Sequence, residues 1–267
     1  LVSGVNLMLA PSTGSSFAVA GMTSMRGCSH TFDYRADGFV RGEACGTTML
    51  QSHKYKYGLD HIHLHGSAVR QDGRSASLTA PNGQAQQMLL TAALDDAGVS
   101  AASLAMVEAH GTGTVLGDPI EAGSLAKAML AFAADEVPLQ IGGVKPNVGH
   151  AEPAAGMTGL LKLAVGLQAM EAAANAELRV LNPHVEKVIQ AVTVIMQVQH
   201  GGIQDDTCEG GVSSFGYSGT IAHAVLQRAS AGVDSPALAR TSLAYRRRAF
   251  TWREPAHPFV QRLVASS

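Results

Sequence analysis

Short apolar segments alternate along the chain with longer segments in which apolar residues recur at helical spacing. A short apolar run bounded by turn residues is typical of a buried strand, and such runs lie at residues 1–8, 44–51, 62–69, 103–109, 139–144 and 191–198. Two more strands, joined by a glycine-rich turn, are expected around Phe215. Helices are predicted at residues 83–97, 119–133 and 151–170. This alternation of strand and helix predicts an α/β fold.

Residues that favour turns separate these elements. Residues 11–16 predict a turn or a helix start, residues 70–75 a turn, and the Asn-Pro-His sequence at residues 182–184 a loop. Beyond about residue 229 the composition shifts, and three arginines stand together at residues 246–248. A change in the chain's organisation is therefore expected near residue 229.

The composition narrows the class of protein. Hydrophobic residues make up 46% of the 267 positions and aromatic ones only 5%, while 29 glycines suit closely packed helices and strands. A net charge of −2 argues against nucleic acid or an anionic membrane as partner. The apolar run at residues 159–170 is too short to span a membrane and contains Lys162. Three cysteines without a CxxC pair favour a reducing compartment. We therefore expect a cytoplasmic protein, with the plastid as the alternative location if the protein is eukaryotic.

Residues 107–121, with the sequence VEAHGTGTVLGDPIE, predict a strand, a tight glycine turn and a helix. Asp118 is expected to cap the helix, Pro119 to take its first position and Glu121 to lie in its first turn. His110 would then stand at the carboxyl end of a strand, which is where open α/β sheets place their ligand chemistry.

Two further stretches carry polar groups in similar positions. Residues 143–156 read GVKPNVGHAEPAAG, so that a loop with Lys145, Asn147 and His150 would join a strand to a helix of small residues. Residues 211–226 read GVSSFGYSGTIAHAVL, which predicts two strands around a turn that follows Phe215.

The three stretches together resemble the β-ketoacyl synthase family, in its polyketide synthase branch, and the resemblance runs from about Leu1 to Arg228. It implies a thiolase-like fold with α-β-α-β-α layers, present incompletely. Residues 1–98 would be the end of the N-terminal half, residues 99–228 the whole C-terminal half, and residues 229–267 the linker that follows a ketosynthase.

The resemblance also implies a reaction, the decarboxylative Claisen condensation of a malonyl-type unit with an acyl thioester. His110 and His150 match the two catalytic histidines, whose N–H groups would stabilise the negative charge on the extender's thioester oxygen. Lys145 matches a catalytic lysine that belongs to an ionic network near the histidines. Glu121 matches the carboxylate that pairs with this lysine, and Asp118 lies one helical turn before it.

Four more residues match positions around the substrate. Thr112 and Thr114 correspond to hydroxyls that bind the phosphopantetheine arm, and Phe215 and Gly216 to the acyl gate and oxyanion loop. A structural alternative stays open for several of them. The threonines suit turn hydroxyls, Glu121 suits a helix N-terminus, and Phe215 suits an ordinary core position.

The resemblance implies particular partners. An acyl carrier protein would deliver malonyl-type and acyl thioesters on its own phosphopantetheine, so no bound cofactor is expected. Neighbouring polyketide synthase domains would flank this one, and the full-length domain would form a homodimer. We expect neither nucleic acid nor a membrane as partner.

The family's nucleophilic cysteine is the one element without a match. The family carries it in a Thr-Ala-Cys-Ser-Ser type turn, and Cys28, Cys45 and Cys208 have other surroundings. Because the chain begins without Met inside a predicted strand, we expect a fragment that lacks the nucleophile and condenses nothing. The alternative is a non-condensing partner subunit that has a structural role or only decarboxylates. Thiolase chemistry is disfavoured, since it needs a second catalytic cysteine late in the chain.

Three alternating histidines are the candidate for a metal site. Because His61, His63 and His65 stand at every second position, a strand would present them on one face. The ketosynthase motifs that the chain resembles do not need these three histidines. We therefore expect no metal site.

Overall fold

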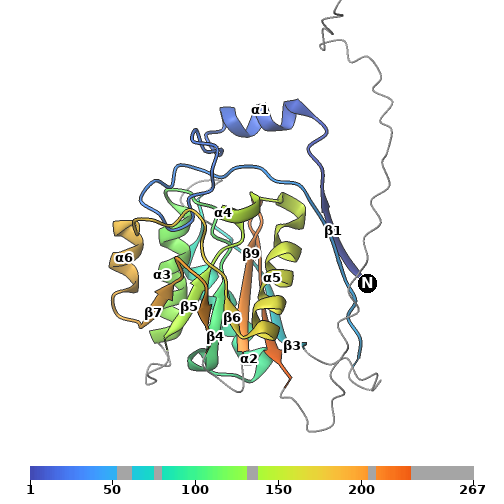
Figure 1. Cartoon of the computed structure of the whole chain (residues 1–267), viewed down its shortest axis with the longest axis vertical. Helices are drawn as coiled ribbons and strands as arrows, with labels where there is room; N and C mark the ends of the chain where they lie inside the picture. Colours follow the sequence, from blue (N-terminus) through green and yellow to red (C-terminus); the bar gives the residue numbers. More distant parts are fainter. Residues whose placement is uncertain (53–61, 75–79, 131–137, 204–208, 230–267) are drawn as a thin grey trace, which may run out of the picture. The chain divides into compact units, whose positions relative to one another are not determined.

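A six-stranded mixed sheet forms the centre of the fold in the computed structural model, which describes residues 1–52, 62–74, 80–130, 138–203 and 209–229 (Figure 1). Its strands lie in the order β3-β10-β9-β4-β5-β7. Their bounds are β3 Ile62–Gln71, β10 Thr220–Arg228, β9 Glu209–Phe215, β4 Leu104–Glu108, β5 Leu139–Gly142 and β7 Val194–Met196. The predicted α/β class is confirmed.

Strand β4 runs through the middle of the sheet, and all five of its residues are buried. It pairs in parallel with β9 on one side and with β5 on the other, so that Val107 faces Gly211 and Ile141. Parallel neighbours end at the same edge of a sheet. The segments that follow β9, β4 and β5 therefore emerge next to one another.

Helices cover both faces of the sheet (Figure 1). Three of them pack on one face and on one another, namely α2 (Gly83–Ala97), α3 (Gly117–Leu130) and α6 (Pro183–Ile189). Helix α5 (Ala155–Ala169) covers the other face and packs against β4, β9 and β10. The resulting three layers bury a continuous core on each face of the sheet.

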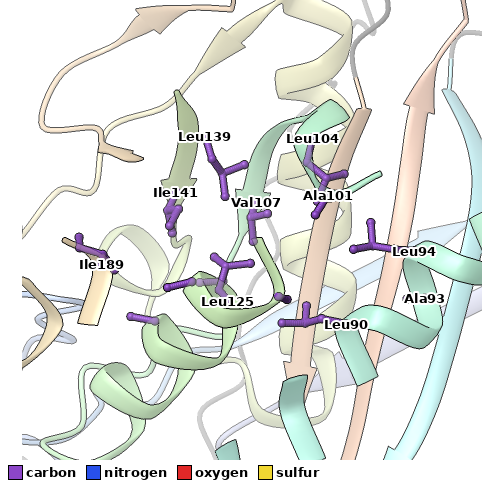
Figure 2. Close-up of a cluster of buried hydrophobic side chains, with 14 of the residues drawn as sticks. Leu90, Ala93, Leu94, Ala101, Leu104, Val107, Leu125, Leu139, Ile141 and Ile189 are labelled. Atoms are coloured by element: carbon purple, nitrogen blue, oxygen red, sulfur yellow. The ribbon is translucent and has the colours of Figure 1, made fainter. Parts of the chain in front are cut away.

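The core between the sheet and its first helical layer consists mainly of aliphatic side chains, from alanine to leucine and isoleucine (Figure 2). Leu90 and Leu94 from α2, Leu125 from α3 and Ile189 from α6 meet Val107, Leu139 and Ile141 from the sheet. Full burial of one such side chain contributes roughly 1.5–3 kcal/mol. This packing fixes the strands whose ends carry the functional residues.

Helix α2 shows how the sequence sets an element's limits. The side chain of Asn82 accepts hydrogen bonds from the backbone N–H groups of Gln84 and Ala85, which have no partner within the helix. Gly98 ends the helix in the left-handed region, with φ of 67°, where glycine carries no steric cost. The predicted bounds of residues 83–97 are confirmed.

The N-terminal segment lies beside helix α5. Strand β1 (Val2–Asn6) pairs antiparallel with β2 (Ala44–Thr48), and both contact α5. Helix α1 (Pro11–Val19) follows β1, so that of the two predictions for residues 11–16 the helix start is confirmed. A second short pair joins β6 (Glu171–Ala172) to β8 (Gly201–Gly202).

Several boundaries differ from the prediction. The helix expected at residues 151–170 is divided: residues Glu152–Ala154, with Pro153 in the middle, form a 3-10 turn (η2), and α5 begins only at Ala155. A second 3-10 turn (η1, Ala101–Ser103) precedes β4. The loop predicted around Lys145 contains a one-turn helix, α4 (Lys145–Val148).

The expected loop at residues 182–184 instead starts a helix. The side chain of Asn182 caps α6, and Pro183 takes its first position. Strand β3 also continues to Gln71, into the predicted turn, because that residue pairs with Thr220 on β10. In both places a tertiary contact or a cap prevails over the local turn signal.

Two predictions about domains remain predictions. Residues 1–98 and 99–228 were assigned to different halves, and the sheet crosses this division, since β3 pairs with β10. The linker expected at residues 229–267 lies outside the described residues except for residue 229. None of the described helices is long and apolar enough to cross a membrane.

Candidate functional site

Three neighbouring parallel strands bring the predicted site residues to one edge of the sheet. Strand β4 is followed by His110, β9 ends at Phe215, and Lys145 comes three residues after the end of β5. His150 follows the short helix α4. Residues far apart in the sequence therefore meet where the strands end, as expected for an α/β sheet.

The loop between β4 and α3 is folded tightly against an earlier segment of the chain. Gly113 has φ of 74°, and a Cβ atom at this position would lie only 2.8 Å from the backbone nitrogen of His30. Thr31 donates a hydrogen bond from its hydroxyl to the carbonyl of Gly111 (2.6 Å). The loop that presents His110 is thus held by the turn at residues 28–32.

Asp118 stabilises this arrangement in a way the sequence did not indicate. It is the second residue of α3, so it is not the helix N-cap that was predicted. Its buried carboxylate accepts hydrogen bonds from the backbone N–H of Phe32 (2.7 Å) and of Gly113 (3.0 Å). Burial raises the pKa of Asp118 to about 7, although these N–H groups favour the charged form.

Glu121 holds the backbone beside the first histidine. Its carboxylate accepts hydrogen bonds from the N–H groups of His110 (2.7 Å) and Gly111 (2.8 Å). Among the described ion pairs of 4.0 Å or less there is none between Glu121 and Lys145. The direct ion pair predicted between these two residues is therefore not found. Glu121 was also predicted to lie in the first turn of its helix, but it lies beyond the first turn of α3.

Lys145 lies beneath His110 in a buried position. Its ammonium group donates a hydrogen bond to the carbonyl oxygen of His110. Burial lowers the pKa of Lys145, while the carboxylates of Glu108 and Glu121 favour its charged form. Lys145 therefore supports the backbone of His110.

Glu108 and Lys162 form a buried ion pair next to this lysine that sequence reasoning missed. Their charged groups are 2.6 Å apart, and Glu108 also accepts a hydrogen bond from the backbone N–H of Val144 (2.6 Å). Both residues interrupt otherwise apolar segments. Charged side chains are almost never fully buried without a partner, so this interruption was the available signal.

The two histidines lie edge to face in the site. Their ring centres are 5.5 Å apart and the ring planes are inclined by 84°. Nδ1 of His110 accepts a hydrogen bond from the backbone N–H of Phe215 (3.3 Å), and Nδ1 of His150 accepts one from the backbone N–H of Glu152 (2.9 Å). A neutral imidazole that accepts at Nδ1 carries its proton on Nε2. Both rings are therefore Nε2–H donors.

Burial keeps both rings neutral. It lowers the pKa of His150 to about 3, with a further contribution from the positive charge of Lys145. Burial likewise lowers the pKa of His110 well below 6.5, and Lys145 and His150 add to this effect. At neutral pH neither ring is an imidazolium, so each offers one hydrogen-bond donor without a net charge.

His150 is fixed by residues from the N-terminal segment. Its backbone N–H donates to the carbonyl of Val40 (2.7 Å), and its carbonyl accepts from the N–H of Gly42 (2.9 Å). Arg41, between these two, forms a partly buried ion pair with Glu152. Since Glu152 donates its N–H to His150 at a φ of 45°, Arg41 stabilises the turn that sets the tautomer of His150.

A cavity of about 510 Å³ opens above the histidines. Its lining includes most of the predicted site residues, namely His110, Thr112, Thr114, Glu121, His150, Phe215 and Gly216. Lys145 and Asp118 are not part of this lining. The ring of Phe215 lies beside His110, with 5.3 Å between the ring centres.

The two threonines at the cavity contact both the local turn and the open cavity. Their hydroxyl oxygens are 3.2 Å apart, and that of Thr114 accepts a hydrogen bond from the N–H of Gly117 (3.1 Å). Thr114 therefore takes part in the local turn, as the structural alternative expects. Both hydroxyls still line the cavity.

The described cysteines and the described members of the alternating histidines do not line the cavity. Neither Cys28 nor Cys45 lines the cavity, and Cys208 is outside the described residues. His61 is also outside them. His63 and His65 lie on β3 and belong to no cluster of three metal-type ligands within the described part of the chain.

Comparisons with known proteins agree with the resemblance seen in the sequence. Residues 1–55 match the family described as beta-ketoacyl synthase, N-terminal domain, and residues 61–179 match beta-ketoacyl synthase, C-terminal domain. A phenolphthiocerol/phthiocerol polyketide synthase of Mycobacterium tuberculosis is 40% identical over 232 residues, which are 85% of this chain and 12% of that protein. The mellein synthase of Phaeosphaeria nodorum is 35% identical over 91% of this chain and 14% of that protein.

Solved structures show the same similarity. The ketosynthase from module 6 of the bacillaene synthase of Bacillus subtilis is 33% identical, with a TM-score of 0.79 over 85% of this chain and 41% of that one. The oxazolomycin ketosynthase domain OzmH KS7 of Streptomyces albus is 30% identical, with a TM-score of 0.83 over 88% of this chain and 42% of that one. The chain thus spans less than half of these ketosynthases and a seventh or less of the curated relatives.

Proposed function

Because the chain belongs to the β-ketoacyl synthase family and has its α/β, thiolase-like fold, we propose that it contributes the decarboxylation site of a polyketide synthase ketosynthase. The reaction is the decarboxylative condensation of a malonyl-type extender with an acyl thioester, and the enzyme is an acyltransferase. The observation that carries the proposal is the pair of neutral Nε2–H imidazoles at one cavity.

Decarboxylation needs stabilisation of negative charge on one oxygen. When the bond between the malonyl carboxylate and the α-carbon breaks, carbon dioxide leaves and the electron pair moves through the α-carbon to the thioester oxygen. Donors fixed in advance stabilise this enolate, and each is worth about a hundredfold or more in rate. His110 and His150 supply two such donors, whose opposite ring nitrogens are held by backbone N–H groups.

The charged groups around the site position these donors. Lys145 holds the carbonyl of His110, and Glu121 holds the N–H groups of His110 and Gly111. Together they fix the backbone of His110 from both sides. We assign both residues to positioning and to the local electrostatic field, since their charged groups bind the backbone of the His110 loop.

The remaining cavity residues suit the substrate arm. Thr112 and Thr114 would bind the phosphopantetheine of an acyl carrier protein, which brings the malonyl and acyl thioesters. Phe215 would act as the acyl gate, and the backbone at Gly216 would contribute to the oxyanion loop. Neighbouring polyketide synthase domains and a second copy of the full-length domain are the further partners that we propose.

The acyl-accepting cysteine is not among the described residues at the cavity. Cys28 and Cys45 are both outside its lining. We therefore propose that this chain does not form the carbon–carbon bond by itself. The alternative, a partner subunit that decarboxylates without condensing, rests on the same histidine pair.

The test is the release of carbon dioxide from malonyl-acyl carrier protein by the purified chain. We expect release above background, and a loss of about a hundredfold or more in His110→Asn and in His150→Asn. His184→Asn, at an exposed position of α6, is the matched control and should behave as the wild type. Release that is unchanged in both cavity variants, or absent from the wild type, would refute the decarboxylation site.

A second reaction tests whether this chain forms the carbon–carbon bond by itself. With acyl and malonyl carrier proteins together, we expect no β-ketoacyl product from this chain. Product that forms and is abolished by Cys28→Ser, Cys45→Ser or Cys208→Ser would show that one of these residues is the nucleophile.

A further inference from the structure

Three residues outside the cavity bring a thiol, an imidazole and a carboxylate together. Cys28 and His30 lie on the turn that supports the glycine loop, and Glu177 lies in the segment between β6 and α6. One ligand atom from each of the three residues lies within 4.8 Å of the others. None of these residues has a part in the proposed reaction.

The imidazole of His30 is buried without adequate hydrogen bonding. The residue is only 3% exposed, and its Nδ1 has no hydrogen-bond partner among the described residues. The contact of its Nε2 with the carboxylate of Glu177 is 3.9 Å, which is too long for a hydrogen bond. A buried polar group usually has a hydrogen-bond partner, so the hydrogen bonding of this imidazole is incomplete.

The charges around the cluster allow a cation to bind. The guanidinium of Arg35 interacts electrostatically with Cys28 and Glu177, but it is paired with the carboxylate of Asp33 at 2.7 Å. Arg35 also donates a hydrogen bond to the backbone carbonyl of Glu177 (2.7 Å), which fixes this residue while leaving its carboxylate for the cluster. The cysteine is present as a free thiol.

We propose that Cys28, His30 and Glu177 bind a divalent transition metal ion, with zinc as the preferred metal. Thiolate, imidazole and carboxylate are the ligands that zinc takes in proteins. Tetrahedral zinc with these bond lengths places its ligand atoms about 3.4–3.6 Å apart. Atoms that already lie within 4.8 Å reach this spacing by small side-chain rotations, and a water molecule completes the four ligands.

Binding would connect two distant segments beside the active-site loop. The backbone of His30 lies directly against Gly113, and the next residue, Thr31, donates a hydrogen bond to the carbonyl of Gly111. An ion at Cys28 and His30 would therefore hold the turn that supports this loop, and Glu177 would attach that turn to the segment before α6. Such binding would not depend on the decarboxylation chemistry.

The test is metal binding by the purified, metal-free chain. Native mass spectrometry should show one tightly bound zinc ion, and cobalt(II) should give the ultraviolet charge-transfer absorption of a cobalt–thiolate bond. Zinc at a hundredfold excess over its Kd should raise the Tm by about 5–10 °C. Cys28→Ser, His30→Gln and Glu177→Gln should each weaken binding by at least about a hundredfold, since even outer-sphere changes cost about ten- to a hundredfold.

Two control variants separate this site from other ligands on the chain. Cys45→Ser removes an exposed thiol, and the pair His63→Gln with His65→Gln removes two histidines of β3. Both should bind zinc and cobalt as the wild type does. Cys28→Ser is a minimal change at a partly exposed position, and an unchanged Tm without zinc will show that it folds.

The proposal fails if the wild type binds no zinc at micromolar concentration. It also fails if Cys28→Ser keeps both the stoichiometry and the charge-transfer absorption. Binding that disappears in the histidine pair on β3 and persists in Cys28→Ser would show an adventitious site there instead.

Discussion

The backbone N–H of Phe215 donates a hydrogen bond to Nδ1 of His110 across 3.3 Å. This contact joins the end of β9 to the loop after β4, two segments that are distant in sequence and adjacent in the sheet. Because it occupies Nδ1, it leaves the proton of the neutral ring on Nε2. Glu152 makes the equivalent contact with His150 (2.9 Å). The backbone of the fold therefore determines which nitrogen of each imidazole can donate.

Replacing Glu121 should weaken both the fold and the site. Its carboxylate is the partner of the N–H groups of His110 and Gly111, and Glu121→Ala leaves both buried donors without a protein acceptor. We expect the free energy of unfolding to fall by roughly 1–3 kcal/mol and carbon dioxide release to fall with it. Chemical denaturation and the decarboxylation assay measure the two effects.

Glu186→Ala is the matched control for this change, since Glu186 is an exposed carboxylate on α6. It should leave both quantities close to those of the wild type. If Glu121→Ala were as stable and as active as the control, its carboxylate would not be holding the His110 backbone.

Arg41→Met should lower the rate while the chain remains folded. Arg41 pairs with Glu152, whose N–H sets the tautomer of His150. Without this ion pair the turn is less constrained, and misplacement of a catalytic group by about 1 Å can cost a hundredfold in rate. Carbon dioxide release should therefore fall by up to about a hundredfold, mainly in kcat.

Arg179→Met tests whether loss of any arginine has this effect, because the side chain of Arg179 is exposed. A rate for Arg41→Met equal to that of Arg179→Met would contradict the role given to the Arg41–Glu152 pair.

His223 should make the fold sensitive to acid. Burial lowers its pKa from the ordinary 6.5 to about 4. Because the folded state holds the ring neutral, the unfolded state binds the proton more readily, so stability is complete above pH 6.5 and falls between pH 6.5 and 4. His223 then costs about 2 kcal/mol of unfolding free energy between pH 8 and pH 5.

The measurement is the difference in unfolding free energy between these two pH values for wild type and His223→Gln. The variant should lose less stability on acidification than the wild type, whatever its stability at pH 8. His184→Gln, which changes an exposed histidine, should show the wild-type difference. An identical difference in all three proteins would mean that His223 is not held neutral.

A side chain at Gly66 should destabilise the fold. A Cβ atom at this position of β3 would lie 2.7 Å from Cα and Cβ of Ala97 in α2. Strand and helix would have to move apart, so Gly66→Ala should destabilise the fold by about 1–3 kcal/mol or more. Gly202→Ala, where a Cβ would meet nothing within 4 Å, is the control. Denaturation midpoints that coincide for the two variants would contradict the packing of α2 on β3.

The sequence was most informative where a local pattern repeats or a motif is long. Helix α2 has a side-chain cap at one end and a glycine at the other, and its bounds were predicted as they are. His110, His150 and Phe215 were identified from motifs, and they meet because three parallel strands end together. Short helices such as α4 and α6 have too few residues to show a helical period.

Pairings between distant side chains were the part that could not be predicted. The carboxylate of Glu121 binds backbone N–H groups instead of Lys145, and Lys162 pairs with Glu108. The position of Glu177 beside Cys28 and His30 depends on how the segment between β6 and α6 folds back. Composition and spacing do not identify the two partners of such contacts, because the contacts form only when the layers pack.

The most direct test of the central claim is nitrogen NMR of the imidazoles in the 15N-histidine-labelled chain, with His110→Asn and His150→Asn used for assignment. Between pH 8 and pH 5 both rings should remain neutral Nε2–H tautomers, since burial lowers the pKa of His150 to about 3 and that of His110 well below 6.5. A non-reactive malonyl-pantetheine amide should shift the Nε2 signals of both rings. An imidazolium or an Nδ1–H tautomer at pH 7 in either ring, or signals that do not respond to this ligand, would contradict the proposed decarboxylation site.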